Sequence, residues 1–68
     1  MFVVVELQKN GETVSNIVTT HETLNEAESK YHQVLMAAAI STVQIHSAVL
    51  LNDSAIPLRH EHYTHDAE

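Results

Sequence analysis

Residues 23–41 read TLNEAESKYHQVLMAAAIS, and this stretch decides the fold because it is the one segment with helical periodicity. Thr23 followed by Glu26 forms a capping box, which marks the start of a helix. Apolar residues then recur at spacings of three and four, which predicts one stripe facing a core. The stripe consists of Leu24, Ala27, Tyr31, Val34, Leu35 and Ala38. We therefore predict a helix over residues 24–41.

The second half of this helix carries more apolar surface than one stripe requires. Residues 34–40 form an unbroken apolar run, and apolarity all round a helix indicates burial on more than one side. A chain of 68 residues has few other elements to cover that surface. We therefore expect Met36, Ala37 and Ile40 to lie at an interface with a second copy of the chain.

The segments on either side of the helix have the composition and alternation of β-strands. We predict strands at about residues 2–8, 13–20, 42–52 and 55–64. Asn10-Gly11 is the strongest short signal for a hairpin turn between the first two. In the second strand Ile17 points away from its apolar neighbours, an irregularity that a β-bulge would repair. Residues 65–68 are expected to form a frayed tail.

The order of these elements predicts a ββαββ protein of the α+β class. The economical arrangement is a single domain, residues 1–68, with a four-stranded, mainly antiparallel sheet and the helix packed across one face. Strand alternation places the odd-numbered valines of the first strand under the helix and the even-numbered residues on the far face. That far face adds four apolar residues to the expected interface: Phe2, Val4, Ala48 and Leu50. Homo-oligomerisation, at least to a dimer, is the main functional expectation.

Composition excludes several classes of protein. There are nine acidic and three basic residues and a formal charge of −6, which argues against binding the phosphates of nucleic acid or anionic lipid. No apolar stretch is long enough to span a membrane and no basic segment opens a signal peptide, so we expect a cytoplasmic protein. Because Cys is absent, disulfides and thiolate metal sites are excluded.

Histidines are the main candidates for a metal site, with six in the chain. In a strand, His60 and His62 lie on the same face and two imidazoles at that spacing can share a zinc ion. His46 or Glu6 would supply a third ligand from a neighbouring strand. The alternative is a polar, histidine-rich edge strand with no metal, or an interface that responds to pH.

A second group of side chains could face a ligand held between subunits. Lys30 and Arg59 are two of the three cations and would suit an anionic small molecule, with Tyr31 and His32 beside them. Tyr31 belongs to the apolar stripe, so the competing interpretation packs its ring in the core with the hydroxyl reaching the edge. No cofactor is expected, and no enzyme: the serines lack a nucleophile motif and no glycine-rich phosphate loop exists.

The segments IVTTHETLNEAESKYHQVLMAAAIS (17–41) and VQIHSAVLL (43–51) resemble a group of short uncharacterised proteins of bacterial genomes and prophages. The capped acidic helix start, the Lys-Tyr-His step and the alanine run carry the resemblance. The resemblance implies a small accessory protein of a mobile element, often oligomeric, and implies no reaction.

Three functions follow as hypotheses. The first is a non-enzymatic, homo-oligomeric phage accessory protein that occupies or sequesters a host protein or a small signalling molecule, such as an antagonist of host defence. The second is a structural or assembly component of a virion. The third is metal binding through the histidines.

Overall fold

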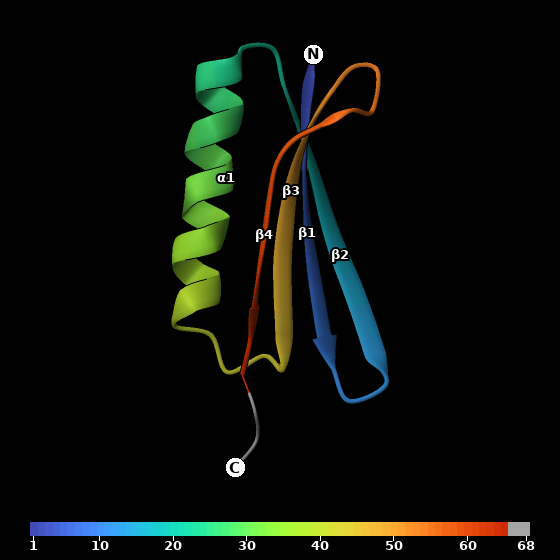
Figure 1. Ribbon diagram of the computed structural model, residues 1–68, viewed down its shortest axis with the longest axis vertical. Helices are drawn as coiled ribbons and strands as arrows, with labels where there is room; N and C mark the ends of the chain where they lie inside the picture. The colour runs from blue at the N-terminus through green and yellow to red at the C-terminus, as the bar shows by residue number, and fades with distance from the viewer. Residues whose placement is uncertain (66–68) are drawn as a thin grey trace.

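Within residues 1–65, four strands form one antiparallel sheet, and a single helix lies across one of its faces. The computed structural model describes residues 1–65. The elements in chain order are β1 (Phe2–Asn10), β2 (Thr13–His21), α1 (Leu24–Ala39), β3 (Ile45–Asn52) and β4 (Pro57–Thr64). The strand order is β2-β1-β3-β4, so β1 and β3 are central (Figure 1). This confirms the predicted ββαββ architecture of the α+β class.

The ends of several elements differ from the prediction. The helix stops at Ala39 and β3 begins at Ile45 rather than at residue 42. Between them, the Ser41 hydroxyl accepts the Val43 N–H at 2.9 Å, a local side-chain turn that replaces strand pairing. The last strand begins at Pro57 rather than at residue 55.

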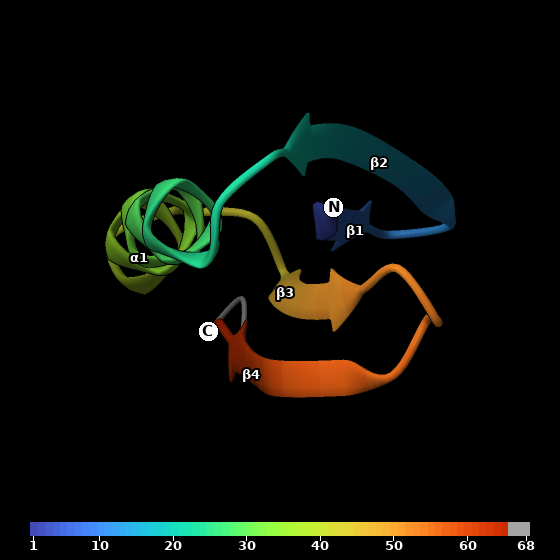
Figure 2. The ribbon, with the colours of Figure 1, turned by 90° about the horizontal axis from the view of Figure 1, so that it is seen from above.

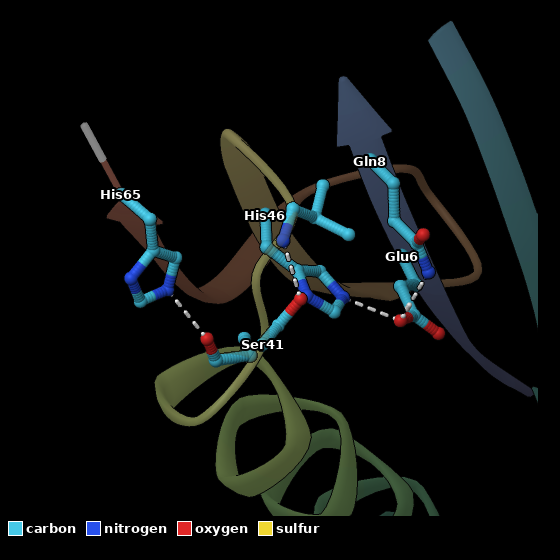
Figure 3. A network of polar contacts seen from close by, with 7 residues as sticks. Glu6, Gln8, Ser41, His46 and His65 are labelled. Carbon is cyan, nitrogen blue, oxygen red and sulfur yellow. Dashed lines mark hydrogen bonds and ion pairs between the residues drawn. The ribbon is translucent and has the colours of Figure 1, made fainter. Parts of the chain in front are cut away.

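His65 was expected to belong to a frayed tail, and this is wrong. Its backbone N–H donates to the carbonyl oxygen of Gln44 at 2.8 Å. Its Nε2 lies 2.9 Å from the carbonyl oxygen of Ala38, in the last turn of α1 (Figure 3). The Ala38 carbonyl also accepts the Ser41 N–H at 3.3 Å, so the imidazole adds a further contact at the end of the helix. The other predicted tail residues, 66–68, lie outside the described residues.

The helix begins as predicted, with one difference in its cap. The Thr23 hydroxyl accepts the Glu26 N–H at 3.2 Å. The Glu26 carboxylate accepts from that same hydroxyl at 3.0 Å, instead of from the Thr23 backbone N–H. The cap therefore satisfies one of the free N–H groups at the start of α1.

The first hairpin turns one residue later than Asn10-Gly11 suggested. Asn10 pairs with Thr13, so the loop consists of Gly11 and Glu12. Gly11 has φ +66°, whereas Glu12 does not adopt positive φ. Positive φ at the first loop position alone is the pattern of a type II′ turn, which favours glycine there.

Because the first hairpin turns one residue later than predicted, the face of the sheet that packs against the helix is the opposite of the predicted one. The chain passes from β2 to the parallel strand β3 through α1 in the right-handed sense that such crossovers adopt (Figures 1 and 2). The hairpin register then decides which side chains face α1, because a one-residue slip moves every side chain to the other face. The even-numbered residues of β1 face the helix, and Val3, Val5 and Leu7 do not.

The core lies between α1 and the two central strands. Its buried residues are Val4, Ala27, Tyr31, Val34, Leu35, Ala48 and Leu50, with Phe2 and Tyr63 packed against them. The predicted bulge in β2 is absent, because β2 pairs with β1 without interruption. As an edge strand with both faces largely exposed, β2 needs no regular alternation. A register shift occurs instead between β3 and β4, at Leu50/Leu51.

Candidate binding surface

The face of the sheet opposite α1 carries apolar side chains from several strands. We call this surface the open face, since no helix or strand among residues 1–65 covers it (Figure 2). Cross-strand pairing arranges its side chains in rows, of which the central one is Val18, Val5, Val49 and His60. The apolar members of the open face are Val3, Val5, Leu7, Val14, Val18, Ile45, Val49 and Leu51, with Pro57 of β4 opposite Leu51. Most of them lie on β2, β1 and β3, whereas β4 contributes His60, His62 and Thr64 to this face.

Charge is almost absent from the open face. Among the described residues that point to this side, Lys9 is the one with a formal charge; the remaining polar ones are uncharged or histidine. The two glutamates of the strands, Glu6 and Glu61, lie on the helix side of the sheet, where both stand opposite Ala48. A protein with a charge of −6 therefore keeps this one surface nearly neutral, which is typical of the centre of a protein interface.

The prediction that Phe2, Val4, Ala48 and Leu50 form an interface is wrong. Val4, Ala48 and Leu50 are buried beneath α1, and Phe2 packs against the same cluster. The physical reason is the hairpin register, which turns these even-numbered residues toward the helix. The true uncovered face is more apolar than the one the alternation suggested.

The outer side of α1 is exposed as predicted. Met36 and Ile40 are 67% and 84% exposed, and Ala37 is exposed beside them. These residues follow the core stripe around the helix and form a narrow ridge. The ridge is smaller than the open face, since only two long apolar side chains contribute to it.

A buried polar network lies at one end of the core (Figure 3). His46, which is 3% exposed, places its Nε2 2.5 Å from Oε2 of Glu6. The same Glu6 oxygen accepts from Nε2 of Gln8 at 3.0 Å. The His46 Nδ1 atom is buried and has no hydrogen-bond partner among residues 1–65. Glu6 and Gln8 are partly buried, and the network links the central strands β1 and β3 through side chains.

The predicted ligand group of Lys30, Tyr31, His32 and Arg59 does not assemble at one place. Tyr31 is in the core, and its hydroxyl is buried rather than at the edge, with no hydrogen-bond partner among residues 1–65. Its ring contacts that of His32 edge-on. Nε of Arg59 donates to Glu28 at 2.6 Å, and this partner raises the pKa of the guanidinium. Arg59 is thus held beside Glu28, and Lys30 lies about 200° around the helix from Glu28. The two cations, Lys30 and Arg59, therefore face different sides of the helix.

The predicted metal ligands are also separated. His60 and His62 are exposed on the open face, whereas His46 and Glu6 lie on the helix side of the sheet. The sheet itself therefore stands between the pair and its expected third ligand. No three His, Cys, Asp or Glu side chains in the described part of the chain lie close enough to hold a metal ion.

Comparison with known proteins gives no relative: no family model, no curated protein and no solved structure matches the chain. Within residues 1–65, no helix has the length and apolar content needed to cross a membrane. The argument for association between copies therefore rests on the surfaces of this chain.

Proposed function

We propose that this chain is a non-enzymatic binding protein that acts as a homo-oligomer, with the open face as the surface through which copies associate. The observation that supports this is the position of apolar residues: the more apolar side of the sheet is the uncovered side. A monomer would leave Val5, Val49 and their neighbours in water. A second open face, equally uncharged, would cover them without opposing like charges.

The dimensions of the open face suit a small interface. Four strands at a spacing of about 4.8 Å span about 19 Å, and eight residues of strand extend about 26 Å. Two such faces stacked at about 10 Å, as in β-sandwiches, would bury about 500 Å² on each chain. The total is at the lower end of the range for specific protein interfaces.

The proposed biological role is occupation of a host partner, with antagonism of a bacterial defence system as its concrete form. The resemblance to short prophage proteins and the acidic surface outside the open face support this role. An acidic exterior fits a partner with a basic groove, since charge complementarity favours encounter.

Sedimentation velocity across a range of concentrations tests the association. We expect the wild-type protein to sediment as two or more copies, and Leu7→Lys/Val49→Lys to lose that association because two charges enter the open face. Met36→Lys/Ile40→Lys adds the same charge to the helix ridge and serves as the matched control. A wild-type monomer at high concentration, or association lost only in the control, would contradict the proposal.

Phage plating tests the role. We expect expression of the wild-type chain to raise the plating efficiency of a phage that a defence system restricts, and the open-face variant to lose this effect. No change in plating across a panel of defence systems would contradict antagonism and leave the assembly result intact.

A further inference from the structure

The edge strand β2 lacks the features by which natural proteins protect a free edge. Its nine residues, TVSNIVTTH, include no charged residue, no proline and no glycine. Val14, Ile17 and Val18 are 62%, 50% and 55% exposed, so both of its side-chain faces are open. A long, uncharged edge strand of this kind is a template for pairing with another strand.

The opposite edge of the sheet, β4, is protected. Proline begins the strand, and Arg59 and Glu61 place charges along it. A register shift interrupts its pairing at Leu50/Leu51. Proline, charge and irregular pairing are the usual means of blocking strand addition. The two edges of the sheet thus differ in protection against strand addition, and β2 is the edge that is available for pairing.

The backbone of β2 is in register for such an addition. The residues that close a two-residue hairpin loop form a hydrogen-bonded pair, here Asn10 and Thr13. The odd-numbered residues of β2 therefore direct their N–H and C=O groups to β1. The even-numbered ones direct theirs to the free edge: Val14, Asn16, Val18 and Thr20.

We propose that β2 pairs antiparallel with β2 of a second copy, centred on Ile17, to give a continuous eight-stranded sheet. In this register Asn16 stands opposite Val18 as a hydrogen-bonded pair, and Val14 stands opposite Thr20. Ile17 stands opposite its own counterpart in a non-hydrogen-bonded pair, where side chains are closest. Every residue meets an uncharged residue, so the pairing contains no electrostatic conflict.

A second copy suits this edge better than a strand of another protein, and this step rests on the proposed role of the open face. The two-fold axis lies perpendicular to the sheet, so both copies of α1 stay on one side and the two open faces join. The joined face measures about 1,000 Å², twice that of one chain. Stacking two joined faces would bury about 2,000 Å² in total, well within the range of stable interfaces. A single foreign strand would widen the face by only about 5 Å.

The two interfaces together close into a tetramer with three perpendicular two-fold axes. One axis relates the β2 edges, and the other two relate the stacked sheets. Such symmetry is common among protein tetramers and leaves no β2 edge free. The four copies of α1 cover the outside of the resulting sandwich.

Substitution of Asn16 tests the edge pairing without disturbing the fold. Asn16→Pro removes one N–H that points to the free edge, which an edge strand tolerates, whereas Asn16→Ala keeps that N–H. Mass by sedimentation equilibrium is the readout, with circular dichroism and urea unfolding as checks on folding. We expect four copies for the wild type and Asn16→Ala, and two copies for Asn16→Pro. The open-face variant Leu7→Lys/Val49→Lys should also give two copies, and the combined variant one.

The outcomes separate this inference from the proposed function. If Asn16→Pro keeps the wild-type mass while the open-face variant loses it, the edge pairing is overturned and the proposed function stands. If Asn16→Pro dissociates and the open-face variant does not, the edge pairing stands alone. If folded Asn16→Ala dissociates as fully as Asn16→Pro, the side chain rather than the backbone N–H is responsible, and the inference is overturned.

Discussion

His46 and Glu6 form a buried pair between the central strands, with 2.5 Å separating Nε2 from Oε2. Because Glu6 belongs to β1 and His46 to β3, this pair joins the two strands through side chains as well as through backbone pairing. The Glu6 carboxylate also accepts a hydrogen bond from Gln8. Among residues 1–65 the other imidazole nitrogen has no hydrogen-bond partner, so Glu6 is the one group of this part of the chain that satisfies the His46 ring. The pair is therefore sensitive to the loss of either member.

We predict that Glu6→Ala lowers the free energy of unfolding by about 3 kcal/mol, because it leaves a buried imidazole without any partner. Glu6→Gln retains an acceptor oxygen and should lose less. Urea unfolding measures both, at one protein concentration and with the oligomeric state checked, because association adds to apparent stability. Gln8→Ala is the control, since it removes a neighbouring bond and leaves the pair in place. Equal losses for Glu6→Ala and Gln8→Ala would contradict the importance of the pair.

Tyr31 is a position where a substitution should increase the stability of the protein. Its ring fills the core at 1% exposure, yet its hydroxyl is buried without a hydrogen-bond partner in the described part of the chain. A buried polar group in that state costs about 1–3 kcal/mol. Tyr31→Phe should therefore raise the free energy of unfolding by about 1 kcal/mol, as measured in urea. Tyr63→Phe, on a half-buried ring, is the matched control and should change stability less.

The same hydroxyl predicts how stability depends on alkaline pH. Burial, followed by the negative charge of Glu61, raises the pKa of Tyr31 above its usual value of 10.0. The folded protein then holds this proton more tightly than the unfolded chain does, so stability is full below pH 10 and decreases as pH rises beyond it. Urea unfolding at pH 9 and pH 11 should show a smaller decrease for Tyr31→Phe than for the wild type. Parallel decreases would rule out this contribution.

The helix could be predicted from the sequence because its signals are local. Thr23 and Glu26 mark its start, and Ala27, Tyr31 and Ala38 mark the face that it buries; the structure bears out all of these. The order of the elements follows from the same kind of signal. Only the last turn was overextended, since the apolar run continues through Ile40 while the backbone leaves the helix.

The candidate surface could not be predicted as reliably because it depends on one turn. Asn10-Gly11 and Gly11-Glu12 are both acceptable two-residue loops, and they place opposite faces of β1 under α1. Alternation alone predicts that Val3, Val5 and Leu7 face the core and that Val4 faces away from it. In the structure Val4 lies in the core, and the other three lie on the open face. The three consecutive valines from Val3 to Val5 were the available signal that both faces of β1 are apolar.

The turn between β3 and β4 contains a strained residue. Ala55 adopts φ +61°, a conformation that costs a residue with a Cβ atom about 1–2 kcal/mol. The Asn52 side chain holds this turn by accepting the N–H groups of Ser54 and Ile56. We predict that Ala55→Gly raises the free energy of unfolding by about 0.5–1 kcal/mol, measured by thermal and urea unfolding. Ala55→Val should lower it, and equal stability of the two variants would contradict the strain.

Gly11 makes the complementary prediction at the first hairpin. It adopts φ +66°, and a Cβ atom added there would meet nothing within 4 Å. The cost of Gly11→Ala is therefore conformational and should be about 1 kcal/mol in the free energy of unfolding. Gly11→Asn should cost less, because asparagine tolerates this region of backbone conformation. Glu12→Ala, at the loop position without positive φ, is the control and should be neutral. If Glu12→Ala destabilises the protein as much as Gly11→Ala, the cost at Gly11 does not come from its positive φ, and the conformational explanation is overturned.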